Sequence, residues 1–147
     1  MSDQEFMNIA IGAAREGRSQ GGIPIGAALV VEGKVLGTGF NKRVQQGSAI
    51  RHGETDCLEN IGRLPAKIYR QSTMYTTLSP CNMCTGAILL YGIPRVVLGE
   101  HETFMGAEEL LRSHGVEVLN LNSEECKKMM RDFIAEEPDL WNEDIGV

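Results

Sequence analysis

The sequence has few aromatic residues, few cysteines, more acidic than basic residues and no long apolar run. Aromatic side chains make up 5% of the 147 residues, and there is a single tryptophan. No apolar stretch approaches the roughly 18 residues that a membrane-spanning helix needs, so no membrane partner is expected. Lys and Arg number 14 against 20 Asp and Glu, giving a net charge of −6. This balance argues against a nucleic-acid partner, because phosphate binding needs a basic surface, and it favours a small, uncharged or weakly charged substrate.

Length and composition predict one soluble globular domain over residues 1–147, long enough to bury a core without disulfides. The opening segment MSDQE is acidic and lacks the basic start of a signal peptide, so a cytoplasmic location is expected. The cysteines fit that compartment. Cys81 and Cys84 form a Cys-x-x-Cys pair, for which metal or redox use is favoured. Cys57 and Cys126 stand alone in helix-like stretches, and we expect them to be small buried apolar side chains.

Helix-like and strand-like segments alternate along the chain, which predicts an α/β sandwich. Glu32-Gly33-Lys34 is expected to be the tight turn of a hairpin, and Pro80 is placed in the first turn of a helix. Because helices separate the late strands, these strands should run parallel. The expected helices cover residues 3–18, 52–61, 79–91, 107–113 and 123–136, and the expected strands cover 25–31, 35–40, 73–78, 96–99 and 116–119.

Two half-motifs with characteristic internal spacing carry the chemistry. His52-Gly53-Glu54 is followed downstream by Pro80-Cys81-Asn82-Met83-Cys84. This combination supplies an imidazole and two thiolates for a zinc ion, and one carboxylate for proton transfer, as in zinc-dependent nucleobase deaminases. Three protein ligands leave the fourth zinc position to water, which distinguishes a catalytic site from a structural one.

Two other interpretations of Cys81 and Cys84 were weighed against catalytic zinc. A structural zinc knuckle needs a second ligand pair, but His101 and His114 lie thirteen positions apart with no cysteine beside them. A redox pair leaves the spacing of His52 and Glu54 unexplained. Glu54 on its own could simply favour the positive end of a helix dipole. In a regular helix, residues two apart point to nearly opposite sides, so its position over the open zinc position depends on the local turn.

At these residues the chain resembles the cytidine deaminase superfamily and, within it, the fungal-type free-base cytosine deaminases. The resemblance covers nearly the whole chain. The tail is its discriminating part, because the zinc motif is shared by many deaminases. The matching segments are Gly22–Gly26, Gly39–Asn41, Gln46–Ala49, Leu58–Leu64, Tyr75–Cys81, Thr85–Ile88 and Trp141–Gly146.

The resemblance implies a three-layer αβα sandwich with a five-stranded mixed sheet, a homodimer, and hydrolysis of cytosine to uracil and ammonia. It also implies roles for particular residues. Glu54 would be the proton carrier, and the tail would close over the pocket as a lid. The residues implied to bind zinc are His52, Cys81 and Cys84, and those implied to contact the base are Ile25, Asn41, Gly53, Phe104, Trp141 and Asp144.

Two departures from the family pattern stand out. The hairpin at residues 32–34 is shorter, and Asn142 replaces an aromatic residue beside the tail tryptophan, which is expected to loosen the tail and alter the substrate range slightly. Two alternative functions remain open at this point. One is deamination of another base: guanine, adenine or adenosine in tRNA. The other is a non-catalytic, zinc-stabilised interaction module, for which Glu54 would have no use.

Overall fold

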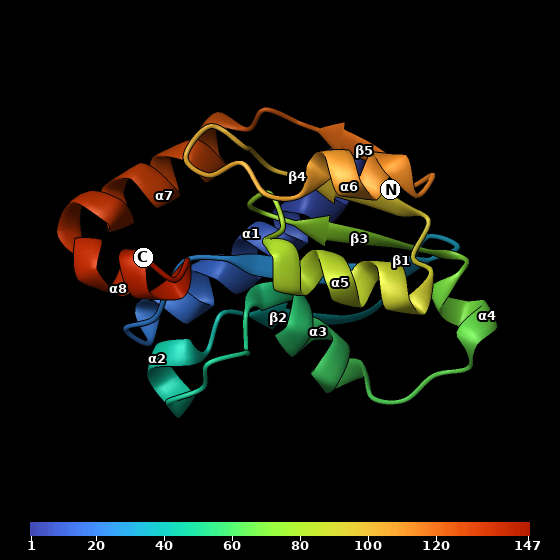
Figure 1. Cartoon of the computed structure of the whole chain (residues 1–147), viewed down its shortest axis with the longest axis horizontal. Coiled ribbons are helices and arrows are strands. Elements are labelled where there is room, and N and C mark those ends of the chain that lie inside the picture. Colours follow the sequence, from blue (N-terminus) through green and yellow to red (C-terminus); the bar gives the residue numbers. More distant parts are fainter.

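A computed structural model describes residues 1–147 and contains one five-stranded sheet in the order β2-β1-β3-β4-β5 (Figure 1). The first three strands in this order pair antiparallel, and β3, β4 and β5 pair parallel. The expected mixed sheet with parallel late strands is therefore confirmed. The strands are β1 (Gly26–Val31), β2 (Lys34–Phe40), β3 (Ser72–Thr76), β4 (Arg95–Leu98) and β5 (Glu117–Asn120).

The turn between β1 and β2 has two residues, Glu32 and Gly33, whose φ angles are 49° and 77°. Positive φ at both positions is the mark of the tight hairpin turn that matches strand twist. Lys34, which the sequence placed in the turn, is the first residue of β2 and pairs with Val31.

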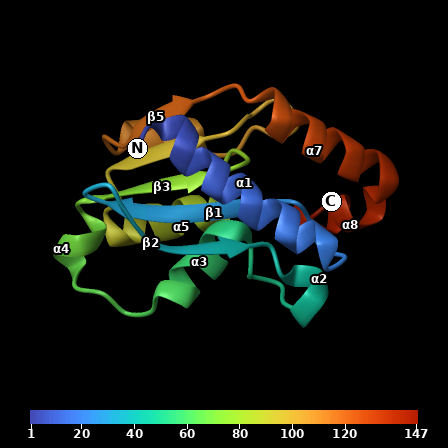
Figure 2. The same cartoon turned by 180° about the vertical axis from the view of Figure 1, so that it is seen from behind.

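Helices cover both faces of the sheet. On one face lie α1 (Asp3–Ser19) and α7 (Glu124–Glu136), where Phe6, Met7 and Cys126 pack against strand residues. This face is in front in Figure 2. On the other face lie α3 (Gly53–Ile61), α5 (Asn82–Tyr91) and α6 (Glu108–Ser113), which bury Cys57 and Ile88. The three-layer arrangement is thus confirmed. Cys57 and Cys126 are both 0% exposed, as expected of small apolar side chains.

A third, smaller core lies at one end of the sheet, under α7 and the final helix α8 (Pro138–Asp144). Met130 and Phe133 of α7 and Trp141 of α8 pack there against Ile25, from the approach to β1, and Leu78, which follows β3. Proline occupies the first turn of α8, where its missing N–H costs no hydrogen bond. The C-terminal segment is therefore held against the end of the sheet where β1 begins and β3 ends.

Three local features differ from the sequence expectations. Pro80 does not lie inside a helix, because α5 begins at Asn82 with Cys81 as its N-cap. The short helices α2 (Arg43–Gln46) and α4 (Ala66–Tyr69) were not expected, and the tail is a helix. Ser123 does cap α7 as expected, since its side chain accepts a hydrogen bond from the Cys126 N–H. No helix of the structure is both long and apolar enough to cross a membrane.

Candidate active site

The three side chains singled out as metal ligands meet where two helices begin. His52 is the N-cap of α3, Cys81 is the N-cap of α5, and Cys84 lies in the first turn of α5. Their ligand atoms all lie within 4.8 Å of one another, and His52 Nδ1 is 3.4 Å from Cys81 Sγ. Both N-cap residues have extended backbone angles, with ψ of 173° and 176°.

This donor set fits a zinc ion. Two thiols and one imidazole are ligand types that zinc binds tetrahedrally, and all four cysteines of the chain are free. No fourth histidine, cysteine, aspartate or glutamate belongs to the cluster. A zinc ion held here would therefore keep one coordination position for a non-protein ligand, which is the feature of a catalytic site.

The pKa values of the two thiols, Cys81 and Cys84, are shifted in opposite directions. The hydrogen bond from Cys84 lowers the pKa of Cys81 to about 4, with a further contribution from His52. The same thiol pair and burial raise the pKa of Cys84 well above its usual value. Burial alone would lower the pKa of His52, but the Cys81 hydrogen bond and nearby negative charges raise it overall. These contacts favour the thiolate form of Cys81, which is the form that binds metal.

Glu54 is the second residue of α3 and is 3% exposed. Because His52 has extended rather than helical backbone angles, the regular helical relation between residues two apart does not apply, and both side chains line the same cavity. Burial, and then the negative charge of Cys81, raise the pKa of Glu54 to about 7. A carboxyl group with this pKa can both take up and release a proton near neutral pH.

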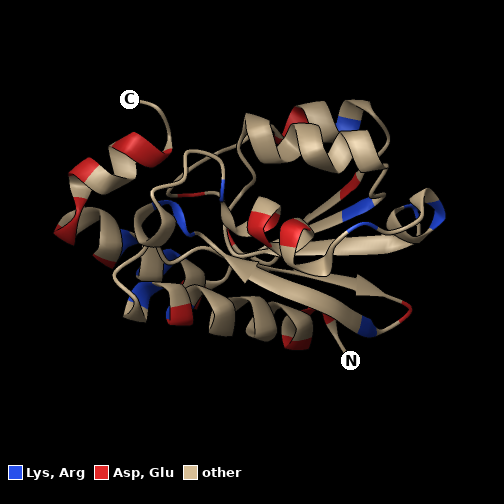
Figure 3. Cartoon of the chain, turned by 90° about the horizontal axis from the view of Figure 1, so that it is seen from below, with Lys and Arg blue, Asp and Glu red and all other residues tan.

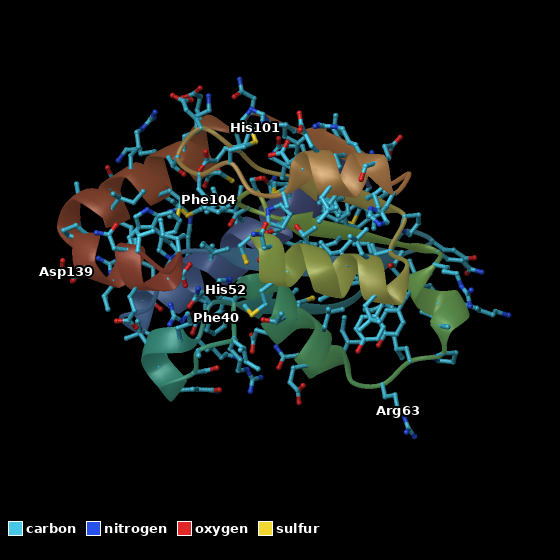
Figure 4. All side chains as sticks on the ribbon, in the orientation of Figure 1. Phe40, His52, Arg63, His101, Phe104 and Asp139 are labelled. Carbon is cyan, nitrogen blue, oxygen red and sulfur yellow. The ribbon has the colours of Figure 1, made fainter.

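A small cavity of about 280 Å³ lies beside the ligand cluster. Besides Glu54 and the metal ligands His52 and Cys81, its walls come from the residue before β1, the segments that follow β3 and β4, and the C-terminal part of α8. Figure 4 shows His52 and Phe104 between α5 and α8. The lining residues are Ile25, His52, Glu54, Leu78, Ser79, Cys81, Phe104, Trp141, Asp144 and Ile145.

The aromatic walls of this cavity come from distant parts of the sequence. The rings of Phe104 and Trp141 have their centroids 6.0 Å apart and meet edge to face at 87°. Trp141 is 6% exposed, whereas its neighbour Asn142 is exposed. Packing of α8 over the cavity therefore depends on the tryptophan.

Asp144 joins the tail to the ligand cluster. Its Oδ1 accepts a hydrogen bond of 2.8 Å from Asn41 Nδ2 and lies 3.4 Å from His52 Nε2. Arg43 lies behind it, with Nη1 at 3.8 Å from the same oxygen and at 2.8 Å from the backbone oxygen of Glu143. A carboxylate on the second nitrogen of a metal-binding histidine fixes the ring's orientation. Asp144 is placed to do this as well as to face the cavity.

Two of the expected base contacts do not line the cavity. Asn41 is fully buried behind Asp144, where its amide donates to that carboxylate and its oxygen accepts from the Arg43 N–H. Gly53 packs against Ile25, and a Cβ added to Gly53 would lie 3.1 Å from the Ile25 backbone oxygen. The other expected base contacts, Ile25, Phe104, Trp141 and Asp144, do line it.

Three lining residues were not expected from the sequence: Leu78, Ser79 and Ile145. Their positions in the sequence were a signal. Leu78 and Ser79 directly precede Pro80-Cys81, just after β3 ends, and Ile145 follows Asp144. Residues adjacent to identified ligands at the carboxyl end of a strand are natural candidates for pocket walls.

Comparisons with known proteins agree with this site. A model of the cytidine and deoxycytidylate deaminase zinc-binding region matches residues 1–100, which include the whole ligand cluster. The chain belongs to this family of zinc-dependent hydrolytic deaminases.

Individual relatives extend the match to nearly the full length. A cytosine deaminase from Candida albicans (strain SC5314) is 55% identical over 145 residues, covering 98% of this chain and 97% of the relative. A tRNA-specific adenosine deaminase from Haemophilus influenzae is 34% identical over 143 residues, covering 89% of this chain and 82% of the relative. A structure from a study of A-to-I editing by tRNA:A34 deaminases gives a TM-score of 0.74 at 28% identity, covering 86% of this chain and 99% of that one.

Proposed function

We propose that this enzyme converts free cytosine to uracil and ammonia. One observation carries the proposal: the buried carboxyl of Glu54 and the α8 residues Trp141 and Asp144 line one small cavity beside the metal ligands. The Candida albicans cytosine deaminase aligns over this same span, α8 included, because the match covers 98% of the chain. Residues 1–147 would then act as one deaminase domain, since its C-terminal helix completes the site.

His52, Cys81 and Cys84 would hold the zinc ion. Zinc bound there would act as a Lewis acid that lowers the pKa of water, so that hydroxide would be available as the nucleophile near neutral pH. The helix starts at which these ligands lie carry the positive end of the backbone dipole, which stabilises the thiolates. Asp144 holds the ring of His52 through its second nitrogen.

Glu54 would carry both protons of the reaction. It first takes a proton from the attacking water and delivers it to the ring nitrogen next to the carbon that bears the amine. It then passes the second proton of that water to the amine, which leaves as ammonia while the carbonyl of uracil forms. A group serves best as base and then acid when its pKa lies near the working pH, and burial raises the pKa of Glu54 in that direction.

The base would be held between apolar walls and the carboxylate of Asp144, which Asn41 supports from behind. Phe104, Trp141 and Ile25 offer surfaces on which a flat ring can pack. Asp144 can accept a hydrogen bond from a ring N–H. Asn41 and Gly53 would act from behind the lining, Asn41 through its hydrogen bond to Asp144 and Gly53 through its backbone N–H.

The size of the cavity favours a single-ring free base. The cavity is small and is closely lined by the side chains of Ile25, Phe104 and Trp141. With α8 packed against Phe104, little room remains for a ribose. Acidic residues on α8 and at the end of α7 (Figure 3) also disfavour the phosphates of a tRNA.

The competing bases can be separated by one assay. Purified zinc-loaded protein is given cytosine, guanine or adenine, and ammonia is measured; inosine formation is measured in a tRNA. We expect ammonia from cytosine and at most traces from the purines, because the cavity is small and closed on one side by Trp141 of α8. Faster turnover of guanine, adenine or tRNA would show that this compound, and not cytosine, is the substrate. The zinc chemistry would be the same.

We also propose that the enzyme is a homodimer and that α5 lies in its interface. The helix has no charged residue, and it exposes Leu90 by 74% and Tyr91 by 43%. Neighbouring apolar side chains on an uncharged helix are suited to contact with another protein surface. A second copy is the occupant that the family resemblance implies.

Sedimentation velocity tests the dimer. The unsubstituted protein should sediment at twice the chain mass of 16.1 kDa, and Leu90→Asp should shift it toward the monomer because a charge would be buried without a partner. Ile50→Asp is the control, since Ile50 is 64% exposed and lies outside α5. A monomeric unsubstituted protein would refute the proposal.

A cytoplasmic location is proposed as well. Four free cysteines suit a reducing compartment, where disulfides are rare. Cell fractionation tests this location, and recovery of the protein only from a secreted fraction would contradict it.

A further inference from the structure

The segment that carries Phe104 is anchored at both ends by buried carboxylates. Glu100 lies at its start with 0% exposure, and Glu108 lies at its end, in the first turn of α6, with 2% exposure. Neither residue belongs to the ligand cluster or lines the cavity. In Figure 4, His101 lies above Phe104 on this segment.

Glu100 shapes the turn directly before Phe104. Its Oε2 accepts hydrogen bonds of 2.7 Å from the Glu102 N–H and 2.9 Å from the Thr103 N–H, and its Oε1 accepts from the Thr103 hydroxyl. These bonds close the turn on itself. The side-chain hydrogen bonds of Glu100 thus stay within its own segment, and only its backbone oxygen reaches the segment before Cys81, where it accepts from the Ser79 N–H at 3.0 Å.

Glu108, in contrast, links the Phe104 segment to the segment between β3 and α5, which contains Ser79 and ends at Cys81. Its Oε2 accepts a hydrogen bond of 2.6 Å from Ser79 Oγ, and both of its oxygens lie 3.2 Å from His101 Nδ1. Ser79 Oγ in turn accepts a bond of 2.9 Å from the Gly106 N–H. Ser79 lines the cavity and lies two residues before Cys81.

The two chain segments also touch through their backbones. The Ala107 N–H donates to the Pro80 oxygen at 3.1 Å, and a Cβ added to Gly106 would lie only 1.9 Å from that oxygen. This approach leaves no room for a side chain at Gly106. The position of the Phe104 wall relative to the metal ligands is therefore set where Ser79, Gly106 and Glu108 meet.

A carboxylate is a costly choice for a buried position whose only task is to fill space, since apolar residues of similar volume often stabilise as well or better. At Glu108 the carboxylate instead orients a hydroxyl of the cavity wall. We infer that Glu108 is a positioning residue for the substrate pocket, which fixes the Phe104 wall through Ser79. This inference rests on the proposed function for its effect on catalysis, but its structural part can be tested without substrate.

The only tryptophan of the chain is the reporter. Trp141 meets Phe104 edge to face, so its fluorescence responds to movement of that wall. In zinc-loaded Glu108→Gln we expect Trp141 emission to shift to longer wavelength and quenching by acrylamide to increase, in the direction of Phe104→Ala. The matched control is Glu109→Gln, because Glu109 is the next residue of the same helix turn and is exposed. It should leave the spectrum unchanged.

Kinetics supply the second readout. We expect Glu108→Gln to raise the KM for cytosine about tenfold, the effect expected from losing one charged hydrogen bond, with kcat and zinc content little changed. Unchanged emission and KM, with only a lower melting temperature, would show that Glu108 merely stabilises the fold and would overturn the inference. If Glu108→Gln does not fold, Ser79→Ala carries the same test and the same two outcomes. A protein that never deaminates cytosine refutes the proposed function, while the spectra still decide the role of Glu108.

Discussion

Glu54→Gln is expected to lower kcat for cytosine by at least ~10²-fold while zinc binding stays at one equivalent. The amide has the same shape as the carboxyl, but it cannot take a proton from water or give one to the ring. Glu54 lies outside the cluster of metal ligands, so its replacement removes no zinc contact. Steady-state release of ammonia, with zinc measured on the same samples, checks both parts of the expectation.

Glu59→Gln is the matched control for this prediction. Glu59 lies on the same helix, α3, but is exposed, so the same change of charge should leave turnover unaltered. Turnover of Glu54→Gln near that of the unsubstituted enzyme would remove Glu54 from the proton pathway. A protein with full zinc and no activity in any variant would instead support a non-catalytic zinc-stabilised module.

Removal of residues 141–147 is expected to abolish turnover of cytosine. The deletion takes away Trp141, which closes the cavity and packs in the third core, and Asp144, which holds His52 and Asn41. Zinc should still bind when supplied in excess, but with an affinity roughly 10–100-fold lower, because the histidine loses the partner that orients it. Ammonia release and a zinc titration with a competing chelator measure the two effects separately.

Two variants test whether this loss reflects the lid or general destabilisation. Removal of Val147 alone, which is 83% exposed, should change neither activity nor zinc affinity. Asp144→Asn keeps the packing of Trp141 and should lower zinc affinity without unfolding α8. Full activity in the protein that lacks residues 141–147 would eliminate α8 as a lid.

The metal ligands could be predicted from sequence because their geometry is local. The spacing of Cys81 and Cys84 places both sulfurs at one helix start, and the spacing of His52 and Glu54 marks a second. The orientation of Glu54 could not be predicted, because it depends on the extended backbone of His52, and helix boundaries are uncertain by one or two residues in any pattern. The structure shows that one residue in a cap conformation brings both side chains to the same cavity.

The strands were predictable because each combines β-branched or apolar residues with flanking turn residues, as in β1 and β4. The short helices α2 and α4 were not, because four residues carry too few periodic positions to give a signal. In α8, the Glu137-Pro138 step marks a helix start, but the polar, acidic composition concealed the helix itself. Asp144 was placed at the pocket only by the family resemblance.

Long-range polar pairing was the part that no local pattern could reveal. Asn41 and Asp144 are 103 residues apart and form a buried hydrogen bond. Glu108 precedes the exposed Glu109 and Leu110 in a short amphipathic helix, so its sequence context is that of a solvated face. Only the packing of the Phe104 segment against Ser79, in the segment between β3 and α5, buries this carboxylate.

The most direct test of the account compares cytosine with cytidine on zinc-loaded protein, following the ultraviolet absorbance of the base together with ammonia. We predict conversion of cytosine to uracil with one ammonia per base, no conversion after zinc is removed by a chelator, and little or no turnover of cytidine, because Phe104 and the α8 residues Trp141 and Asp144 close over the cavity beside the metal ligands. Equal turnover of the nucleoside, or turnover of cytosine that persists without zinc, would contradict it.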